Sequence, residues 1–478
     1  MTARRGIQFS LARITIEMQT AFRVGARLDD DLHDAVFTTD ANGLPAIPGT
    51  SIAGVLRHAY AAAKGVADPH AKKGPVADLF GFQQGEAAAS SLVSLSWGHA
   101  HDQHDRPVPF LGATLAGDPV LELLWKGVVR DHVRISEAGV VDDAGKFDEL
   151  VVPAGSRFTF EIKVEQGATS SSEALDELIA LLASPHTRIG GKTRNGLGAF
   201  KVVRAARRTF NLSDRRDYDA WCKVPTDLAA SVPPGVLESA KIPAPLSLDD
   251  SANTSPYTVH VPLIPEDSWI FGGGDKEAWS AEEDADILPV REQRISYSGG
   301  RGTIDTSLLL IPGSSIKGAL RHRTLFHIRR REEDYWEAGS DQRPLAADTN
   351  PTLASLFGSI KANDGSGTPG RVRFRDIALK PAQTARFDHV SIDRFTQGPM
   401  DHHLFNELTC FGGSLELEID ILPPAEPDDD YNTALQAFAD ALEDLCEGNL
   451  SLGAASSRGH GYFAGTINRA SVTREDTP

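Results

Sequence analysis

Apolar and polar residues alternate over several short stretches of this chain, and the alternation predicts β-strands. Residues 8–18 (QFSLARITIEM) and residues 257–264 (YTVHVPLI) alternate clearly, so each is expected to be a strand with one buried face. In two other regions the apolar residues recur three and four positions apart, which is the spacing of one helix face. This spacing predicts amphipathic helices at residues 172–184 and 432–446.

The predicted elements come in the same order twice, and four sequence motifs mark the two copies. IPGTSIAGVLRH at residues 47–58 recurs as IPGSSIKGALRH at residues 311–322, with nine of twelve positions identical. Further along, DLFG is matched by SLFG, DHVRI by DHVSI, and IGGKTRNGLGAF by LGAASSRGHGYF. Motifs that keep their order and spacing predict a duplicated domain. We therefore expect domains at residues 1–210 and 254–478, joined by a linker at residues 211–253 that is rich in Pro, Ser and Asp.

Each copy is expected to contain an opening strand, a loop, a helix after the IPG motif, further strands, a second helix and a closing strand. Strands and helices mixed in this order predict an α+β domain of the split βαβ kind. The second copy alone carries residues 293–310 ahead of its IPG motif, and their pattern predicts an inserted β-hairpin. A short helix is expected within the linker, at residues 217–222.

Length and cysteine content narrow the class of protein. A chain of 478 residues is too long for one ordinary hydrophobic core. Cys222, Cys410 and Cys446 are odd in number and widely spaced, which argues against a disulfide framework or a zinc finger and indicates a reducing cytoplasm. We find no apolar run long enough for a membrane span, and the first residues do not resemble a signal peptide.

The net charge of −18 opposes nucleic-acid binding over the surface as a whole, because phosphates need a positive surface. The charge is uneven, however. Acidic residues gather at residues 282–287 and 423–431, whereas basic residues gather at residues 321–331, directly after the second IPG motif. A nucleic-acid-binding protein of this composition must collect its cations on one face.

The IPG motif predicts a helix start that can bind an anion. Pro48 and Gly49 break the incoming chain, and Ser51 is expected to be the N-cap of the following helix, as Ser314 or Ser315 is in the second copy. Backbone amides and hydroxyls at a helix N-terminus attract phosphate, and nearby cations strengthen the attraction. The alternative is a capped core helix with solvated basic residues. If a phosphate binds here, the expected contacts are Ser51, Arg57, Ser315, Lys317 and Arg321.

The glycine-rich motif predicts a second ligand-binding loop in each copy. Lys192 and Arg194 lie among four glycines in the first copy, and Arg458 lies among three in the second. Glycines let the backbone approach a ligand closely, and the cations would face phosphate or sugar. A tight turn between helix and strand is the alternative, and the motif is neither a Walker loop nor a dinucleotide-binding fingerprint.

Taken together, IPG-[ST]-S-I-x-G-x-LR, the later LFG and the glycine-rich motif resemble the RAMP superfamily of CRISPR-associated proteins. More narrowly, the chain looks like the repeated backbone subunit of type III interference complexes, and its two fused copies resemble the double-backbone subunits of type III-D-like effectors. The resemblance covers the length of each copy. It implies ferredoxin-like or RRM-like cores with a β-hairpin thumb, and it implies crRNA, target RNA and other type III subunits as partners.

The resemblance also implies a catalytic aspartate, located in cleaving members between the opening strand and the IPG motif. Residues 34–40 (DAVFTTD) and 286–292 (DILPVRE) resemble the family pattern D-x-x-V-x-[RT]-D. The implied catalytic residues are Asp34 and Asp286, with Asp31 and Asp284 next in line and Asp305 as a further choice in the second copy. Such a carboxylate would hold Mg²⁺ or position a 2′-hydroxyl for attack on the adjacent phosphate of target RNA. A solvated acidic turn, in a structural subunit that binds crRNA without cleaving RNA, is the alternative.

The two copies differ at a motif beside the expected thumb. Residues 388–398 (DHVSIDRFTQG) resemble the family's IDR-x-T-x-G stretch, which implies Arg394 as an RNA contact. The first copy has Glu137 at the matching position, so Arg134 is the candidate RNA contact there. This difference predicts that the two RNA sites are not equivalent.

Three histidines in one loop, His99, His101 and His104, have a spacing that suits metal ligands. No fourth ligand accompanies them, so we interpret the segment as an exposed loop at a strand end and assign no metal to it. Processing of guide RNA by histidine chemistry, which some relatives perform, also lacks a suitable histidine pair in this sequence.

Overall fold

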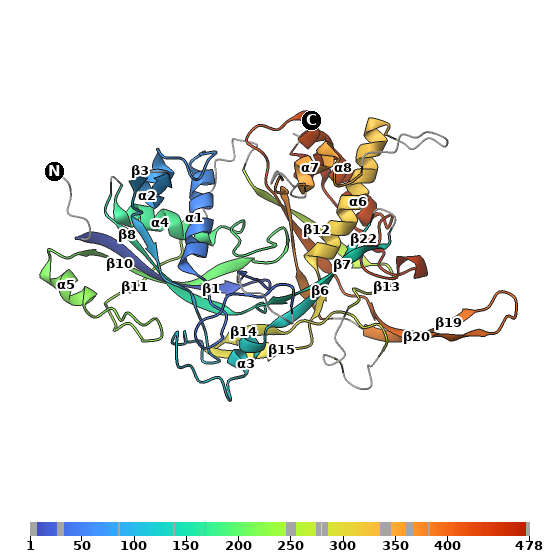
Figure 1. Cartoon of the computed structure of the whole chain (residues 1–478), viewed down its shortest axis with the longest axis horizontal. Coiled ribbons are helices and arrows are strands. Elements are labelled where there is room, and N and C mark those ends of the chain that lie inside the picture. The colour runs from blue at the N-terminus through green and yellow to red at the C-terminus, as the bar shows by residue number, and fades with distance from the viewer. Residues whose placement is uncertain are drawn as a thin grey trace.

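In a computed structural model, the two predicted copies form two α+β domains that lie side by side (Figure 1). The structure describes residues 7–25, 33–84, 87–136, 139–167, 169–244, 255–273, 279, 285–334, 346–359, 367–380 and 383–474. Among these residues, no helix combines the length and the apolar character that a membrane crossing requires. We call residues 7–244 domain 1 and residues 255–474 domain 2.

The core of domain 1 is an antiparallel sheet whose strands lie in the order β10-β1-β8-β4. Its strands are β1 (Gln8–Met18), β4 (Val93–Leu95), β8 (Arg157–Glu165) and β10 (Phe200–Asn211). Alternate residues of β8, including Phe158 and Phe160, are fully buried against helices α1 (Gly49–Ala63) and α4 (Ser171–Ala183). A last strand beside the first, with β8 between β1 and β4, is the order of a ferredoxin-like fold.

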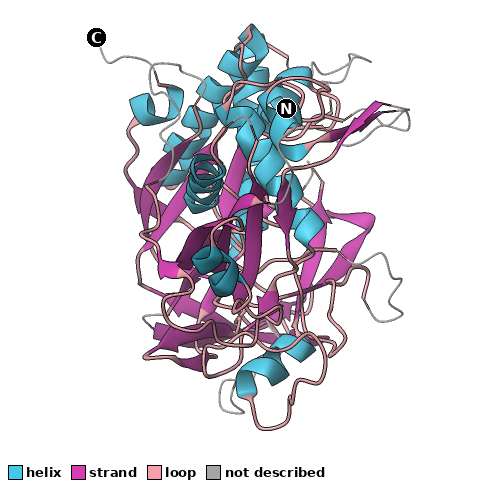
Figure 2. Cartoon of the chain, turned by 90° about the vertical axis from the view of Figure 1, so that its left-hand side faces the viewer, coloured by secondary structure: helices cyan, strands magenta, loops and turns pink. Residues whose placement is uncertain are grey.

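Domain 2 repeats this arrangement, with its strands in the order β22-β12-β21-β17. Its elements are β12 (Tyr257–Pro265), β17 (Val372–Arg375), β21 (Leu415–Ile421), β22 (Phe463–Gly465), α6 (Gly313–Glu332) and α8 (Asp429–Cys446). Helices α1 and α4 of domain 1 and helices α6 and α8 of domain 2 lie on the same side of the molecule (Figure 1), and the turned view also shows helices gathered at the top (Figure 2). The predicted α+β class and the ferredoxin-like cores are therefore confirmed.

Shorter elements complete both domains. Those of domain 1 are α2 (Pro75–Phe80), β2 (Phe82–Gln84), β3 (Ala87–Ala89), β5 (His99–Ala100), α3 (Pro119–Lys126), β9 (Asn195–Gly196), α5 (Arg215–Trp221) and β11 (Glu238–Ser239). Those of domain 2 are β13 (Ser268–Trp269), β14 (Arg294–Ser298), β15 (Arg301–Asp305), β16 (Leu309–Ile311), α7 (Pro351–Phe357), β18 (Ile377–Leu379), the 3₁₀ turn Ser456–Arg458 and α9 (Arg469–Thr473).

Each domain carries a β-hairpin that stands apart from its sheet. In domain 1 it is β6 (Val128–Ile135) with β7 (Val141–Val151), and in domain 2 it is β19 (Gln383–Ile392) with β20 (Pro399–Phe411). The pairing shifts between Val133 and Ile135 in one hairpin and between the matching Val390 and Ile392 in the other, so the repeat extends to a local bulge. These hairpins are the predicted thumbs, and we call them thumb 1 and thumb 2. Thumb 2 extends away from the rest of the molecule (Figure 1).

Both IPG helices begin earlier than the sequence predicts. Pro48 is the N-cap residue of α1, and its carbonyl accepts the amide hydrogen bond of Ser51 at 2.9 Å. Pro312 has the same position before α6, so neither Ser314 nor Ser315 is an N-cap. The predicted N-cap serines are wrong because proline fixes φ near the helical value, which lets the helix begin at the following glycine. The serines instead lie in the first helical turn.

The predicted linker is partly folded onto domain 1. Helix α5 packs its Trp221 ring edge-on against Phe9 and Phe210, with ring centroids 4.9 and 5.5 Å away. Strand β11 pairs with β10 and extends the sheet at that edge. Residues 212–244 thus belong structurally to domain 1.

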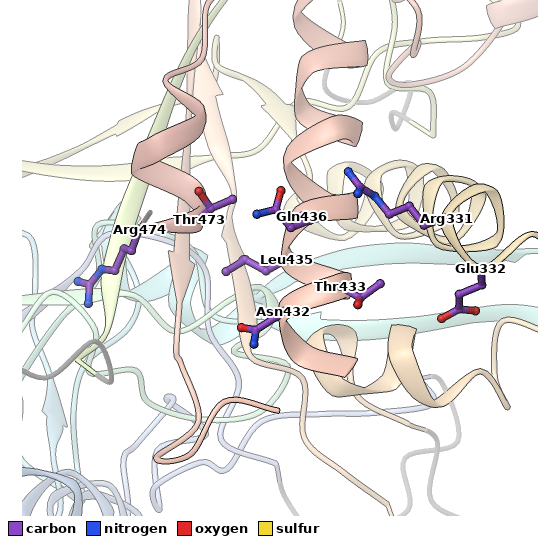
Figure 3. Close-up of a pocket in the computed structure, with 8 residues that line it drawn as sticks. All are labelled: Arg331, Glu332, Asn432, Thr433, Leu435, Gln436, Thr473 and Arg474. Carbon is purple, nitrogen blue, oxygen red and sulfur yellow. The ribbon is translucent and has the colours of Figure 1, made fainter. Parts of the chain in front are cut away.

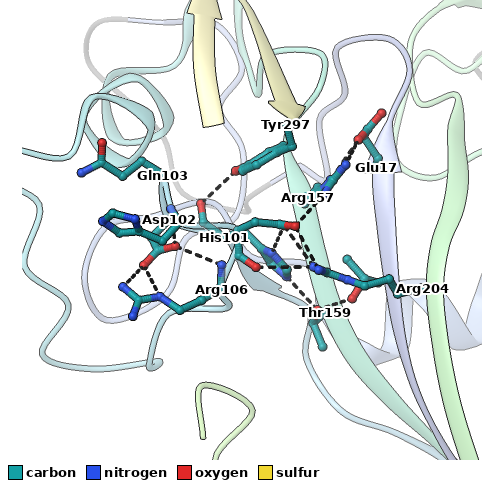
Figure 4. A network of polar contacts seen from close by, with 12 residues as sticks. Glu17, His101, Asp102, Gln103, Arg106, Arg157, Thr159, Arg204 and Tyr297 are labelled. Atoms are coloured by element: carbon teal, nitrogen blue, oxygen red, sulfur yellow. Dashed lines mark hydrogen bonds and ion pairs between the residues drawn. The ribbon is translucent and has the colours of Figure 1, made fainter. Parts of the chain in front are cut away.

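The insertion before the second IPG motif forms the predicted hairpin, β14–β15, and it docks on domain 1. The amide of Ile295 donates to the carbonyl of Ala154 at 2.9 Å, and the Tyr297 hydroxyl donates to the carbonyl of His101 at 3.4 Å. The Arg157 guanidinium lies over the Tyr297 ring, 4.5 Å from its centroid (Figure 4). This hairpin therefore ties the two domains together.

The histidine-rich loop supports that docking surface. His101 is fully buried, with Asp105 Oδ1 at 2.9 Å from one ring nitrogen and Thr159 Oγ1 at 2.7 Å from the other (Figure 4). His99 bonds the Val108 carbonyl. The prediction of an exposed histidine loop is wrong for His101, because β8 and the docked hairpin enclose it.

Candidate nucleic-acid interface

The glycine-rich loop of domain 1 meets the IPG helix of domain 2. Strand β9, in that loop, pairs in parallel with β17, placing Asn195 opposite Phe374. Gly196 adopts φ +111°, and a side chain there would collide with Asp376. A Cβ on Gly313, at the start of α6, would lie 3.0 Å from the Gly196 Cα. Both glycines are needed because two backbones approach each other here.

Two predicted RNA-binding cations come together at this junction. Arg194 Nε donates to the Gly370 carbonyl at 2.5 Å, and Lys317 Nζ donates to Asn195 Oδ1 at 3.0 Å. Within the described parts of the chain neither side chain forms an ion pair with a carboxylate. Burial, together with the charges of Arg194 and Arg321, lowers the pKa of Lys317 to about 8. We call Arg194, Lys317 and Arg321 the junction cations.

Thumb 1 reaches the same junction. Arg134, on β6, and Arg321, on α6, both bind the carboxylate of Asp348, at 2.5 and 2.9 Å. Arg130, also on β6, is buried between Glu292 and Asp376 of domain 2. Four of the predicted contacts, Arg134, Arg194, Lys317 and Arg321, are therefore gathered where the domains meet.

A buried glutamate anchors thumb 1 to the glycine-rich loop. Glu149, on β7, is fully buried and faces His132 Nε2 at 2.7 Å, Arg23 Nε at 3.1 Å and Lys192 Nζ at 3.1 Å. His132 stacks on Phe147, with centroids 4.9 Å apart. Burial alone would raise the pKa of Glu149, but the His132 hydrogen bond and the Lys192 charge lower it to about 2. The predicted RNA contact Lys192 thus already binds a carboxylate.

Domain 2 has the same cluster at its own thumb. Glu407, on β20, is fully buried and faces His389 and His460 at 2.9 Å each, and it pairs with Arg458. His389 stacks on Phe405, with centroids 4.9 Å apart. The repeated histidine of the DHV motif therefore binds a buried glutamate in both copies. Sequence reasoning missed these two glutamates, although each follows its histidine at nearly the same distance along the chain.

The candidate aspartates lie directly beside these clusters. The Asp34 amide donates to Asp148 Oδ1 at 2.9 Å, and the Asp148 amide donates back to Asp34 Oδ2 at 3.0 Å. Asp286 and Asn406 repeat this exchange, with both distances at 2.9 Å. Asp34 and Asp286 are both exposed. They hold equivalent places, because the partner of each directly precedes a buried glutamate in the chain: Asp148 precedes Glu149, and Asn406 precedes Glu407.

The other aspartate candidates do not share that place. Asp305 lies in β15, where it binds Ser307 and forms a 3.7 Å ion pair with Lys380. It therefore does not correspond to Asp34, and Asp286 is the matching residue. Asp31 and Asp284 lie outside the described residues.

The remaining predicted RNA contacts have other surroundings. Arg57 holds a loop of domain 1, donating to the carbonyls of Pro69 at 2.7 Å and Gly81 at 2.9 Å. Arg394 is exposed in the turn of thumb 2, and Ser315 is exposed in the first turn of α6. Ser51 lines a cavity described below, and Glu137 lies outside the described residues.

Among the described residues, no group of three or more histidine, cysteine or acidic side chains is arranged to hold a metal ion. Asp34 and Asp286 each offer a carboxylate at an exposed position. Magnesium commonly binds through one or two protein carboxylates and completes its shell with substrate phosphates and water. The two aspartates fit that mode of binding, in which the substrate supplies part of the site.

Comparisons with known proteins agree with the duplicated fold. A family model described as "RAMPs: RAMP superfamily" matches residues 15–201 and 298–464, one region in each domain and more than half of the chain in total. No curated protein matches the sequence. One solved structure that was matched is "Type III-B Cmr-beta Cryo-EM structure of the Apo state", at 12% identity and a TM-score of 0.30, covering 40% of this chain and 96% of that chain. A similarity of this size carries no argument about function or assembly.

Proposed function

Because the chain belongs to the RAMP superfamily, we propose that it is a backbone subunit of a type III CRISPR complex and holds crRNA at the junction of its domains. The observation that supports this function is the pair Arg194 and Lys317, two half-buried cations without a carboxylate partner among the described residues. Half-buried cations of this kind are costly unless an anion binds them, because burial removes water from the charge. RNA phosphates supply that anion.

The duplication suits a polymeric ligand. A strand of RNA presents the same phosphate again several nucleotides on, so two similar domains can hold one strand. The protein contacts backbone and shape in this proposal, while base pairing between crRNA and target RNA supplies the sequence specificity. Other type III subunits would contact the exposed ends of the two-domain unit, and the fusion of two copies fits a III-D-like complex. The reducing cytoplasm, which suits its three free cysteines, is the expected compartment.

Asp34 and Asp286 are the proposed catalytic residues for cleavage of bound target RNA. In this reaction the 2′-oxygen attacks the adjacent phosphorus, its proton passes to a base, and the 5′-oxygen leaves with a proton. Each carboxylate accepts a hydrogen bond from a thumb amide, which fixes its position beside the bound strand. Mg²⁺, when bound by the aspartate and the RNA phosphates, would neutralise charge that develops on the phosphate.

One observation favours a structural subunit as the second candidate function. The same exchange of hydrogen bonds that positions Asp34 also ties its loop to β7, and a loop tie needs no catalysis. In domain 2 the partner is Asn406 rather than a second carboxylate. The substitutions argued in the Discussion separate the two functions.

Replacing both Arg194 and Lys317 by alanine tests the proposed RNA site. We expect single-stranded RNA to bind about 10- to 100-fold more weakly at low salt, because two phosphate contacts are lost. The slope of log K against log salt should become shallower by about 1.4, or about 0.7 for each cation lost on a single strand. Fluorescence anisotropy over a salt series measures both quantities.

The matched control is the double change Arg215→Ala and Lys241→Ala, which removes two exposed cations from the segment after β10. This variant has the same net charge as the test variant. The proposed site is contradicted if both double variants weaken RNA binding to the same extent, because the effect then follows total charge.

The lowered pKa of Lys317 predicts a pH dependence of RNA binding. With a pKa of about 8, Lys317 is charged at pH 7 and loses its proton as the pH rises toward 9. RNA affinity should therefore fall several-fold between pH 7 and pH 9. The Lys317→Arg variant keeps its charge over this range and should show a flat profile. Equal pH profiles for the two proteins would show that Lys317 does not contact RNA.

A further inference from the structure

A cavity of about 600 Å³ lies between the two domains, beside the glycine-rich loop of domain 1. Its walls come from α1 and the glycine-rich loop of domain 1 and from β17 of domain 2. This volume is within the range of small-molecule sites. Neither Asp34 nor Asp286 lines it, so it is a separate feature from the proposed catalytic residues.

The charge of this cavity is one-sided. His58, His186, Arg188 and Arg373 line it, and among the described residues no aspartate or glutamate does, although the chain has 66 acidic residues. A second cavity, between α6, α8 and α9 (Figure 3), differs because Glu332 lines it and its Arg331 is paired with Asp440 at 2.6 Å. The cavity between the domains is therefore suited to an anion.

Arg373 supplies a cation that the fold does not neutralise. Asp420 is fully buried and already pairs with Arg188, His186 and Arg375. Arg373 donates one bond, to the His186 carbonyl at 2.6 Å, and its buried Nε has no hydrogen-bond partner in the described structure. Burial and the neighbouring Arg188 and Arg194 lower the pKa of Arg373 to about 10. An anion in the cavity would satisfy this side chain.

The N-terminus of α1 opens into the same cavity. Thr50, Ser51 and Gly54, from its first two turns, line the wall, and no side chain of the described residues caps the helix. In domain 2 the corresponding end of α6 is already occupied, because Asp376 Oδ1 accepts from the Gly313 amide at 2.8 Å. A free helix N-terminus adds to the attraction for an anion. The two domains have therefore diverged at this point.

Part of the remaining wall is apolar. Val55 and Ala59 of α1, Leu181 of α4 and Leu422 of domain 2 all line the cavity. An inorganic anion would leave this surface in water, whereas a ligand with a flat organic part would cover it. The combination of cations, a helix N-terminus and an apolar wall is the chemistry that recognises a nucleotide.

We propose that this cavity binds one nucleotide, with its phosphate against Arg373 and the α1 N-terminus and its base against Val55, Ala59 and Leu181. The nucleotide has two possible sources, a free mononucleotide or one nucleotide of the bound RNA strand. Arg194, Lys317 and Arg321 do not line this cavity, although Arg194 directly follows the lining residue Thr193 in the glycine-rich loop. A failure of the RNA-binding test above would leave the free-nucleotide source standing.

The test uses the full chain, purified free of RNA, and titrates it with AMP, UMP and inorganic phosphate by calorimetry. We expect both nucleotides to bind at least about tenfold more tightly than phosphate, since the apolar wall contributes only to nucleotides. Ala59→Phe fills the cavity and should abolish that binding. Ala53→Phe is the matched control, because Ala53 is a half-buried alanine of the same helix that does not line the cavity.

A second arm identifies the source of the nucleotide. RNA that carries 4-thiouridine is cross-linked to the chain, and mass spectrometry locates the modified peptides. Cross-links to α1 or β17 that disappear in Ala59→Phe assign the site to the RNA strand, even if AMP does not bind. If AMP, UMP and RNA all fail to reach the cavity, or if phosphate binds as tightly as AMP, the proposal is overturned.

Arg373→Gln keeps the proposal testable if Ala59→Phe folds poorly. The amide of glutamine can still donate to the His186 carbonyl, but the positive charge is gone. Nucleotide binding should weaken about tenfold or more, which corresponds to the loss of one charge-assisted hydrogen bond. Unchanged nucleotide affinity in Arg373→Gln would rule out the phosphate position proposed here.

Discussion

Cleavage of target RNA stops when Asp34 and Asp286 are both replaced by alanine: this is the result we expect for the assembled complex with crRNA and Mg²⁺. Each single replacement should remove the cut made by its own domain and leave the other cut. A general base or a metal-binding carboxylate contributes about 10²- to 10⁴-fold to a rate. Denaturing gels that resolve product lengths measure the two cuts separately.

Replacing Asp34 by asparagine distinguishes a catalytic role of the carboxylate from a role in holding the loop in position. Asp34→Asn removes the charge but keeps an oxygen that can accept the Asp148 amide hydrogen bond, so the loop should stay tied to β7. If catalysis requires the carboxylate, Asp34→Asn loses its cut as fully as Asp34→Ala does. If the aspartate only ties the loop, Asp34→Asn keeps most of its activity. Asp305→Ala is the control, because that residue lies in the docked hairpin.

The outcome also decides between the two proposed functions. A structural subunit predicts that no product band depends on either aspartate, while crRNA binding stays intact in all variants. Loss of crRNA binding in the alanine variants would indicate that the loops themselves hold RNA. Each result therefore assigns a different role to the hydrogen bonds that join each aspartate to its thumb.

The sequence was sufficient to predict what each copy contains. The repeated motifs predicted two domains, their strands and helices, and the inserted hairpin, because these features depend on local spacing of apolar residues and on glycine and proline positions. The helix starts were predicted two or three residues late, since serine looked like a better N-cap than Pro48 or Pro312. Proline was the stronger determinant because it restricts the backbone directly.

The pairing between copies was not predictable in this way. The motifs were compared as equivalents, copy with copy, whereas the structure joins the glycine-rich loop of domain 1 to the IPG helix of domain 2. The local spacing of apolar residues does not indicate that Lys317 faces Asn195. The buried Glu149 and Glu407 were missed for a related reason: a charged residue within a strand pattern is expected on the exposed face. Only the three partners around each glutamate explain its burial.

The paired glutamates predict a large effect on stability. Replacing Glu407 by alanine leaves Arg458 without its buried partner and removes the acceptor that His389 and His460 share. Because Arg458 is itself exposed, the main loss is that of hydrogen bonds to a charged group, each worth about 1.5–3 kcal/mol. Glu407→Gln keeps an acceptor oxygen, so it should lower the free energy of unfolding by less than Glu407→Ala does. Urea unfolding of the full chain at pH 7 measures the difference.

The pH dependence of this stabilisation follows from the direction of the pKa shifts. The pKa of Glu149 is lowered from 4.5 to about 2, and that of Glu407 is lowered as well. A lowered carboxylate pKa means that the stabilisation is fully present above pH 4.5 and is lost as the pH falls toward the folded-state pKa. The gap in unfolding free energy between the wild type and Glu407→Ala should therefore narrow between pH 5 and pH 3.

The two domains should respond differently to the same change. Thumb 1 is held at a second place, because Arg130 and Arg134 pair with carboxylates of domain 2, whereas thumb 2 extends away from the molecule (Figure 1). Glu149→Ala should therefore leave the amides of thumb 1 protected from hydrogen exchange. Glu407→Ala should release thumb 2, with fast exchange along β19 and β20. Equally fast exchange in both thumbs would mean that the contacts with domain 2 add nothing to the anchoring of thumb 1. The buried glutamate alone would then set the position of each hairpin.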